Sequence, residues 1–288
     1  MNRPKHFATF EEELDYFLNY TLQEDIGSGD HSSLACIPSN AVGTSKLLVK
    51  EQCILAGLEV IEPIFKKLDP DARIQFYKAD GAVCQLGEIA FEVTARIYAL
   101  LSGERLMLNI LQRMSGIATR TRRLADMISH TRCRLLDTRK TTPGMRFLEK
   151  RAVLIGGGAN HRFGLYDMIM LKDNHIDFAG GIEKAIRKTH QYLAEKNLSL
   201  KIEVECRNLN EVEQVLTVGG VDRIMFDNFS PSMIVEALKL VNGKMETEAS
   251  GGISEQNIVE YAETGVDFIS MGALTHSVRS VDLSFKAG

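Results

Sequence analysis

From about residue 130 onward, short apolar segments alternate with segments of helical periodicity. The helical segments lie at 181–197, 209–216, 230–241 and 254–265. Strands that alternate with helices in this way form a parallel sheet. Six or seven such units predict a compact or incomplete α/β barrel. The six apolar segments that we interpret as its strands are 133–138, 167–172, 201–206, 223–228, 245–251 and 267–272.

Helix signals support the same division of the chain. Ser230 followed by Pro231 is a favourable helix start, and Gly265 is a favourable helix stop. Near the beginning, Thr9 and Glu12 match a capping box, which predicts a helix over 9–23.

The region that follows the predicted helix at 9–23 has the pattern of strands. Residues 43–100 are rich in β-branched and aromatic residues, and turn signals divide them, so we expect several strands there, including EIAFEVTARIYALL. A helical pattern then runs from about 104 to 128, with an expected interruption at Ser115-Gly116.

Charge and cysteine usage limit the class of protein. The net charge is −4 and the pI is near 6.0, so no global field attracts nucleic acid. No apolar run reaches the roughly 18 residues of a membrane span, and no signal-peptide apolar region follows MNRPKHF. Five cysteines without a CxxC pair are typical of a reduced, cytoplasmic protein.

Polar residues collect where the predicted barrel strands end. The carboxyl ends of barrel strands form the rim on which barrel enzymes build their sites. The alternative is that strand ends lie near solvent and tolerate charge, which explains any one strand but not six. The residues are Asp137, Arg139, Lys140, Lys172, Asp173, Glu203, Glu205, Asp227, Asn228, Glu248, Ser250, Ser270 and Gly272.

The rim divides by the sign of its charges. Its cations are Arg139, Lys140, Lys172 and, in a nearby loop, Arg162. Grouped cations repel one another unless an anion lies among them, so we expect a polyanionic ligand that arginine holds bidentately. The carboxylates of Glu205 and Asp227 are suited either to a divalent ion such as Mg²⁺ or to sugar hydroxyls. Sequence alone leaves that choice open.

Two late strands end in small residues, SGGIS (250–254) and SMGALTHS (270–277). Backbone N–H groups in such turns bind phosphate, and barrel phosphate sites usually follow the last two strands. GGGANH (156–161) does not connect a strand to a helix, so we interpret it as a loop that directs His161 and Arg162 inward. His161 and His175 are either acid–base groups or structural hydrogen-bond partners.

Several motifs together resemble one family, the quinolinate phosphoribosyltransferases, also called carboxylating nicotinate-nucleotide pyrophosphorylases. They are DTRKTTPGMRFLEKRAV, GGGANHRFGLYDMIMLKDNHI, FDN, EASGGIS and TGVDFISMGALTHS, and they occur in the family's order over nearly the whole chain. The resemblance implies an N-terminal open-faced α/β sandwich domain (1–114), joined by a C-terminal tail (276–288). An incomplete α/β barrel (115–275) would carry the site.

The resemblance also implies an enzyme, a glycosyltransferase of NAD biosynthesis. Such an enzyme converts quinolinate and phosphoribosyl pyrophosphate (PRPP) to nicotinate mononucleotide, pyrophosphate and CO₂ with Mg²⁺. It implies a homodimer or a larger homo-oligomer with shared active sites.

By the family pattern, each candidate residue has a role. Arg139, His161, Arg162 and Lys172 would line the quinolinate pocket, and Arg105 would be supplied by a neighbouring subunit. Lys140, beside Thr138, would lie between quinolinate and the pyrophosphate. Glu205 and Asp227 would hold the ribose hydroxyls and Mg²⁺, directly or through water. The catalytic set would be Lys140, Lys172, Glu205 and Asp227, and the 5′-phosphate would bind Ser250, Gly251, Gly252, Met271, Gly272 and Ala273.

Three rival interpretations remain at this point. A paralogue with the same fold could act on another substrate, and a binding protein could keep only the phosphate pocket. A barrel enzyme could instead use Lys172 as a Schiff-base amine. The donor of the proton that replaces the lost carboxylate is also open, because His161, a lysine or water could supply it.

Overall fold

The computed structural model describes residues 9–288, which fall into two compact units. The first unit contains the chain up to Arg120 together with Thr142–Gly157 and Ser277–Gly288. The second contains Thr121–Thr141 and Gly158–His276. The domain expected at 115–275 therefore includes residues 142–157, which here group with the first unit. The expected N-terminal domain (1–114) and the segment MNRPKHF begin in residues 1–8, which lie outside the described part of the chain.

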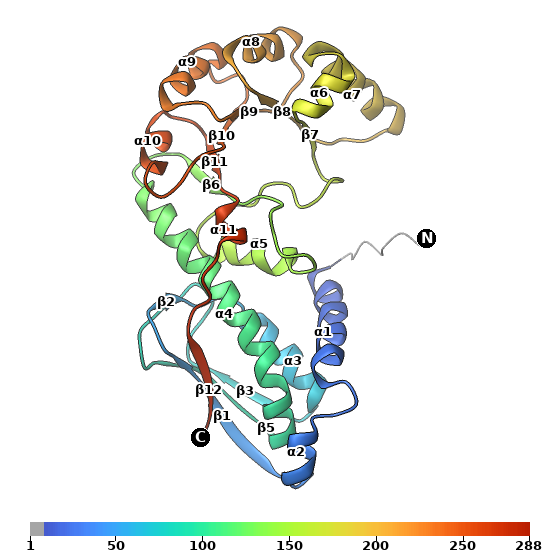
Figure 1. The fold of residues 1–288 in the computed structure, drawn as a ribbon, viewed down its shortest axis with the longest axis vertical. Coiled ribbons are helices and arrows are strands. Elements are labelled where there is room, and N and C mark those ends of the chain that lie inside the picture. Colours follow the sequence, from blue (N-terminus) through green and yellow to red (C-terminus); the bar gives the residue numbers. More distant parts are fainter. Residues whose placement is uncertain (1–8) are drawn as a thin grey trace. The chain divides into compact units, whose positions relative to one another are not determined.

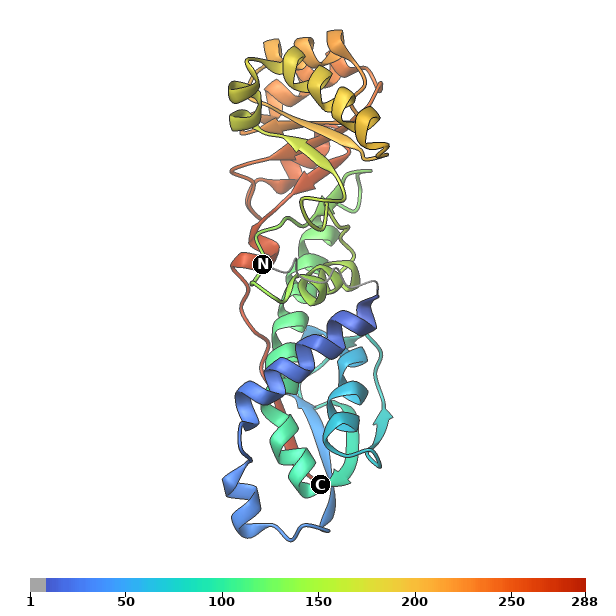
Figure 2. The same cartoon turned by 90° about the vertical axis from the view of Figure 1, so that its right-hand side faces the viewer.

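The first unit is built on a four-stranded antiparallel sheet in the order β12-β1-β5-β3. The red C-terminal strand β12 lies beside the blue β1 (Figures 1 and 2). One face of the sheet is polar, with Thr44 opposite Thr94, whereas Phe91 and Phe285 on the other face are buried. The strands are β1 (Val42–Val49), β3 (Arg73–Phe76), β5 (Ile89–Arg96) and β12 (Leu283–Ala287), and a separate pair is β2 (Cys53–Ile54) with β4 (Val83–Cys84).

Helices cover the buried face of this sheet, which gives the expected open-faced sandwich. Phe65 on α3 stacks on Phe285 of β12, with ring centroids 5.9 Å apart. The predicted capping of the first helix is confirmed, since the Thr9 hydroxyl accepts the Glu12 N–H at 3.2 Å. The helices are α1 (Phe10–Ile26), α2 (His31–Cys36), η1 (Leu58–Val60), α3 (Ile61–Leu68), α4 (Ile97–Met127) and α5 (Arg146–Ile155), with α4 continuing beyond Arg120.

Two expectations about the α4 region are wrong. The segment IYALL (97–101), expected as strand, forms the first turns of α4, and no interruption occurs at Ser115-Gly116. Ser115 is fully buried, and its hydroxyl accepts the Ala56 N–H at 3.0 Å. A Cβ on Gly116 would lie 2.3 Å from the carbonyl oxygen of Arg279. The glycine therefore allows close packing inside a continuous helix rather than ending it.

The second unit contains the predicted parallel sheet, in the order β6-β11-β10-β9-β8-β7. The first strand, β6, pairs with the last, β11, so the sheet curls toward closure (Figure 1). The two edge strands, β6 and β7, do not pair with each other, and Leu136 of β6 instead forms a bridge with Ala159 in the loop before β7. The barrel is therefore incomplete, as expected. Its strands are β6 (Arg134–Leu136), β7 (Ile169–Leu171), β8 (Ile202–Cys206), β9 (Arg223–Asp227), β10 (Glu246–Ser250) and β11 (Phe268–Ser270).

Helices lie on the outside of this curved sheet (Figure 1). The start predicted at Ser230 is confirmed, because its hydroxyl accepts the Met233 N–H and Pro231 occupies the first turn of α9. The helices of this unit are α6 (Asp173–Ala179), α7 (Ile182–Lys196), α8 (Leu209–Val218), α9 (Pro231–Val241), α10 (Ile258–Glu263) and α11 (Ala273–His276). Among the described residues, every helix is too short or too polar to cross a lipid bilayer.

Candidate active site

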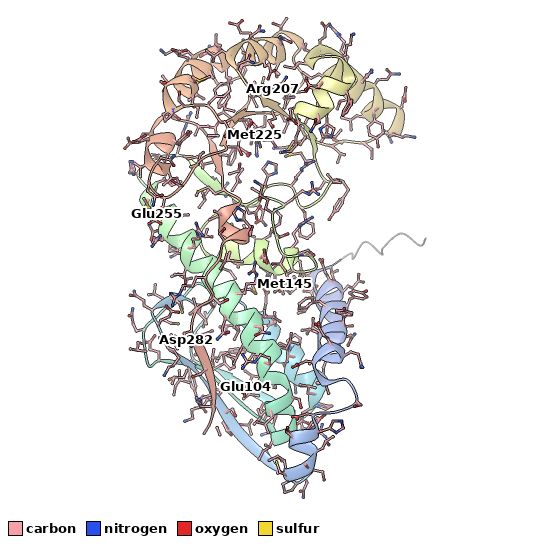
Figure 3. The ribbon with its side chains drawn as sticks, viewed as in Figure 1. Glu104, Met145, Arg207, Met225, Glu255 and Asp282 are labelled. Atoms are coloured by element: carbon pink, nitrogen blue, oxygen red, sulfur yellow. The ribbon has the colours of Figure 1, made fainter. Side chains whose placement is uncertain are left out.

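A cavity of about 770 Å³ opens at the carboxyl ends of the barrel strands. It lies wholly within the second unit, and every residue to which the family pattern gave a role, except Arg105, lines it. Met225, labelled in Figure 3, belongs to its wall. The candidate residues in the lining are Thr138, Arg139, Lys140, His161, Arg162, Lys172, Glu205, Asp227, Ser250, Gly251, Gly252, Met271, Gly272 and Ala273.

The cations of the cavity are crowded. Arg162 is almost fully buried, and its Nη1 donates to the carbonyl oxygen of Met168 at 3.2 Å. Burial lowers the pKa of Arg162, and the positive charge of Arg139 lowers it further. A lowered pKa means that the charged guanidinium is disfavoured in the free protein. An anion that enters the cavity would relieve this strain, so the site is electrostatically prepared for one.

Carboxylates lie on the adjoining strands. The Lys172 ammonium is 3.1 Å from Oε2 of Glu205 at the end of β8. Asp227 ends the next strand, β9, so both carboxylates reach the same cavity from neighbouring strands. The cavity thus presents cations and carboxylates together, which suits a ligand with both anionic groups and hydroxyls.

The segment after β6 is held against the last barrel strand. The Thr138 hydroxyl accepts the Lys140 N–H at 3.0 Å, and the Thr275 hydroxyl donates to the Lys140 carbonyl at 2.7 Å. A Cβ on Gly272 would lie 2.7 Å from Cδ of Lys140. Glycine at this position therefore lets the lysine side chain pass across the end of β11.

The turn after β10 is shaped for close approach of a ligand. Gly251 and Gly252 have φ of +89° and +65°, which side-chain-bearing residues rarely adopt. The Asn257 side chain donates to the Gly252 carbonyl at 3.2 Å and accepts the Ser254 N–H at 2.7 Å. The turn is therefore fixed from within and does not need a ligand to order it.

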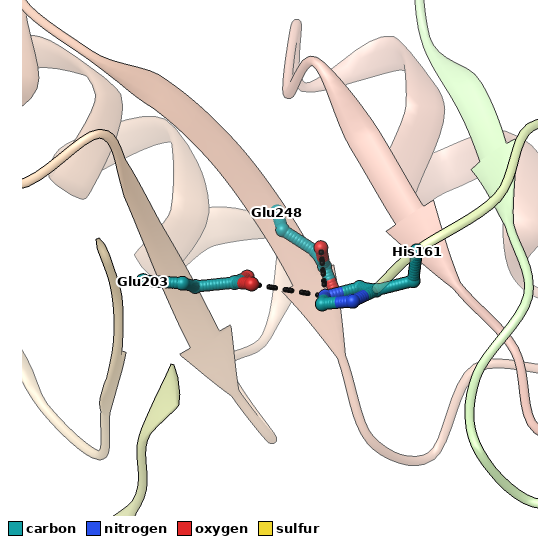
Figure 4. A group of neighbouring side chains, drawn as sticks. All are labelled: His161, Glu203 and Glu248. Atoms are coloured by element: carbon teal, nitrogen blue, oxygen red, sulfur yellow. Dashed lines mark ion pairs between the residues drawn. The ribbon is translucent and has the colours of Figure 1, made fainter. Parts of the chain in front are cut away.

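His161 lies on a buried pair of carboxylates. Its Nε2 is 2.9 Å from Oε2 of Glu203 on β8 and 3.3 Å from Oε2 of Glu248 on β10 (Figure 4). Both glutamates are fully buried, and Glu248 is also paired with Arg223 at 3.0 Å. The His161 backbone N–H donates to Asp137 at 2.9 Å. His161 therefore ties the loop before β7 to three barrel strands.

The ring proton of His161 is subject to opposing influences. Its Nδ1 accepts the Arg162 N–H at 2.6 Å, which favours a neutral ring with the proton on Nε2. Burial also lowers the pKa of His161, but hydrogen bonding to Glu203 and Glu248 outweighs it and raises the pKa to about 9. Burial and the charge of Glu248 raise the pKa of Glu203 to about 7. Burial acts to raise the pKa of Glu248, but its interaction with His161 outweighs burial and lowers it. His161 and Glu203 therefore bind protons more tightly in the folded protein than in the unfolded chain, and Glu248 binds one less tightly.

This cluster predicts how stability varies with pH. A group whose pKa is raised by folding stabilises the protein below its unfolded value and loses that effect as the pH passes its folded value. The windows are about 4.5 to 7 for Glu203 and 6.5 to 9 for His161. We expect the free energy of unfolding to fall by on the order of 1–3 kcal/mol as the pH rises from 5 to 9. Urea titrations at several pH values measure it.

Glu203→Gln is the matched test for the lower window, because the amide keeps the shape and removes the proton site. In this variant the stability between pH 5 and 6.5, below the window of His161, should be nearly independent of pH. A wild-type protein whose stability rises across that window would contradict the assignment.

The same three residues also satisfy the distance criterion for a metal site. Among residues 9–288, they are the group of His, Cys, Asp or Glu side chains whose ligand atoms lie within 4.8 Å of one another. A metal on Nε2 would move the ring proton to Nδ1, where it would oppose the Arg162 N–H. Arg223 already neutralises one of the carboxylates. The arrangement is therefore better suited to a proton than to a metal ion.

The lining also contains residues to which the sequence gave no individual role, although Asn228, Glu248 and Ser270 were predicted to lie at the rim. Asn228 directly follows Asp227, and His276 lies in the motif after β11. The others lie two positions before a predicted strand-end residue, so strand alternation directs them to the same interior. That alternation could have identified the two that the sequence analysis did not name, Met170 and Met225. The four residues at these alternating positions are Met170, Met225, Glu248 and Ser270, and Ile253 completes the lining.

Two candidates from the sequence lie apart from the cavity lining. His175 accepts the Lys172 N–H on Nδ1 at 3.1 Å, which is a structural contact at the start of α6. Arg105 is exposed on α4 and lines a separate cavity of about 740 Å³ in the first unit, together with residues of α1. Arg105 is therefore not part of the lining of the barrel cavity.

Comparison with known proteins gives consistent matches over the chain. The family model for the quinolinate phosphoribosyl transferase C-terminal domain matches residues 117–286, and that for the N-terminal domain matches 30–115. A rice protein named nicotinate-nucleotide pyrophosphorylase [carboxylating], chloroplastic, is 43% identical over 289 residues, covering 95% of this chain and 77% of its own. A probable enzyme of the same name from Bacillus subtilis is 42% identical over 272 residues, covering 94% and 92%. The solved nicotinate-nucleotide pyrophosphorylase of Francisella tularensis is 36% identical with a TM-score of 0.91, covering 100% of both chains.

Proposed function

The chain belongs to the quinolinate phosphoribosyltransferase family, and from that premise we propose the reaction that its cavity performs. The protein transfers the phosphoribosyl group of PRPP to quinolinate with decarboxylation. The products are nicotinate mononucleotide, pyrophosphate and CO₂, in de novo NAD biosynthesis. It is a carboxylating nicotinate-nucleotide pyrophosphorylase. The observation that carries this proposal is the single cavity in which cations, two strand-end carboxylates and a glycine turn converge.

We propose that quinolinate binds on the cationic side of the cavity. Quinolinate is a dianion, and burial of its charges is costly unless each one is paired. Arg139, Arg162 and Lys172 supply those pairs, and the disfavoured charge of Arg162 in the free protein supports this role. The forked guanidinium of Arg162 suits a carboxylate in two-point contact.

We propose that PRPP binds on the side of the cavity that contains the carboxylates and the two small-residue turns. The carboxylates of Glu205 and Asp227 are suited to accept hydrogen bonds from the ribose hydroxyls. The turns at Ser250–Gly252 and Met271–Ala273 offer backbone N–H groups to the 5′-phosphate. Lys140 lies between the two ends and is suited to the charge of the leaving pyrophosphate.

Mg²⁺ is proposed as the cofactor, and the residues present fit it. Mg²⁺ bound with a phosphorylated substrate commonly uses one or two carboxylates, with waters and phosphates as its other ligands. Glu205 and Asp227 provide such a pair in one cavity. When bound, the ion would neutralise charge on the pyrophosphate.

The chemical step must separate charge at C1 of the ribose. As the bond to pyrophosphate breaks, positive charge develops on the sugar, and fixed carboxylates stabilise it. Holding both substrates in one cavity makes the step effectively intramolecular, worth about 7–11 kcal/mol in favourable geometry. Once the pyridine nitrogen is quaternised, it stabilises the carbanion left by the departing CO₂.

The proton that then reaches this carbon is proposed to come from a lysine or from water. His161 is a poor donor because its Nε2 is buried against Glu203 and Glu248, and its Nδ1 accepts the Arg162 N–H. We therefore assign His161 to holding the loop that carries Arg162. Schiff-base chemistry on Lys172 is not favoured, since its ammonium is half exposed and paired with Glu205 rather than desolvated.

The assembly is proposed to be a homodimer with shared active sites, or a larger homo-oligomer. Arg105 supports this proposal, because it is an exposed cation that does not line the barrel cavity. Supplied to a partner subunit, it would add a further positive charge for quinolinate. We also propose a cytoplasmic location, which the free state of all five cysteines supports among the described residues.

The decisive experiment uses quinolinate labelled in the carboxylate that is lost, together with PRPP. We expect labelled CO₂, pyrophosphate and nicotinate mononucleotide in equal amounts with Mg²⁺, and loss of turnover when a chelator removes it. Binding of both ligands without release of CO₂ would instead support the paralogue or the binding protein.

A further inference from the structure

Asn228 adopts a backbone conformation that its position in the chain does not explain. It follows the last residue of β9 with φ of +56°, in the left-handed region. Among residues 9–288, the other residues with positive φ apart from glycine are Asn197 and Asn242. Both of those are C-caps of helices, α7 and α9, where this conformation is usual. Asn228 ends a strand, so its strain requires a different cause.

The side-chain amide of Asn228 is bonded to the neighbouring carboxylate. Its Nδ2 donates to Oδ2 of Asp227 at 2.9 Å. The opposite amide orientation would bring Oδ1 against that carboxylate and repel it, so the hydrogen bond fixes the orientation. The carboxylate is therefore held by a donor on the next residue, whose backbone is in the left-handed conformation.

Asn228 is also joined to the glycine turn after β10. Its backbone N–H donates to the Ser250 carbonyl at 2.8 Å. A Cβ on Gly251 would lie 2.3 Å from Oδ1 of Asn228, so glycine is needed for this approach. One residue thus contacts both the strand-end carboxylate and the turn that begins at Ser250.

We propose that Asn228 is a positioning residue that holds the Asp227 carboxylate in register with the Ser250–Gly252 turn. This inference rests on the proposed function, in which the carboxylate and the turn bind the ribose and the 5′-phosphate of one PRPP molecule. The distance between those two groups in PRPP is set by the sugar, so the protein must hold its two contacts at a matching separation. Asn228 supplies that fixed relation.

The identity of the residue follows from these two demands. Only glycine, asparagine and aspartate adopt the left-handed conformation readily. Glycine lacks the amide, and aspartate would place a second negative charge beside Asp227. Asparagine alone meets both requirements.

The test compares two variants of the full chain. Asn228→Gly keeps the backbone conformation and removes the amide, and Asn228→Asp keeps the shape and replaces the donor by a charge. We expect kcat/KM for PRPP to fall about tenfold in Asn228→Gly and further in Asn228→Asp. The KM for quinolinate should stay within about twofold, and the melting temperature should be retained in Asn228→Gly. Asn242→Gly, at the C-cap of α9, is the matched control and should leave all values unchanged.

The order of the variants separates this role from a merely structural one. If Asn228 served only the backbone, the aspartate variant would be as active as wild type. Unchanged PRPP kinetics in Asn228→Gly, or equal losses for both substrates, would overturn the proposal. Calorimetry of PRPP binding to the wild type, Asn228→Gly and Asn228→Asp tests the positioning role of Asn228 even if no turnover is seen. Wild-type protein that binds PRPP without turnover would count against the proposed function alone.

Discussion

Replacement of Arg162 by alanine is expected to weaken quinolinate binding by at least about 30-fold, with little change in PRPP binding. Removal of one partner from a buried charge pair costs about 2–5 kcal/mol, because the other charge is left unpaired. Arg162 is almost fully buried and lines the cavity beside Arg139, so water cannot replace it readily. The free protein should lose little stability, since burial and then the charge of Arg139 disfavour the charged guanidinium and lower its pKa. Calorimetry with each ligand measures both affinities.

Arg132→Ala is the matched control for this variant. Arg132 precedes β6, at the opposite end of the barrel strands from Arg139, and its side chain is 76% exposed. Its loss should leave both affinities unchanged. An Arg162→Ala protein with wild-type affinity for quinolinate would show that the dianion binds elsewhere.

Replacement of Asp227 by asparagine is expected to lower kcat by about 10²–10³-fold. Asparagine has the same shape as aspartate but no negative charge, so it cannot stabilise the positive charge that develops on the ribose. Quinolinate affinity should be retained, because the quinolinate contacts lie on the cationic side of the cavity. Single-turnover release of labelled CO₂ reports the chemical step directly, with PRPP and Mg²⁺ saturating.

Glu236→Gln, on the exposed surface of α9, controls for the loss of a carboxylate from the same unit. It should turn over at the wild-type rate. A fall of less than tenfold in Asp227→Asn would mean that the carboxylate acts in binding alone and that another group stabilises the transition state.

The barrel could be predicted from the sequence because local and long-range signals agree there. Its strands are short apolar runs between helices whose starts are marked, as at Ser230. The α4 region could not be predicted in the same way. The local sequence around Gly116 predicts a helix break, yet the residue lies inside α4. Glycine is needed there because the carbonyl of Arg279 packs directly against it. That contact joins residues far apart in the chain, which no local pattern reports.

The features of the site that could not be predicted from the sequence have a similar explanation. Strand ends identified the residues that face the ligand, but Glu203 and Glu248 were expected at the same rim and not in the interior of the barrel. Both are fully buried, because His161 and Arg223 offset their charges inside the barrel. Pairing of this kind depends on three strands and a loop that meet only in the folded protein. A sequence therefore shows that a charged residue lies on a strand, but it does not show which partners neutralise that charge in the folded protein.

The pairing of β12 with β1 has a consequence for biosynthesis. On the ribosome, β1 emerges early, but its outer neighbour is made only after all six barrel strands have been translated. Until then the flank of β1 exposes unpaired backbone groups, which are prone to join other chains. The nascent protein therefore has a long interval of vulnerability to aggregation, and shielding by a chaperone during translation would matter most for this early strand.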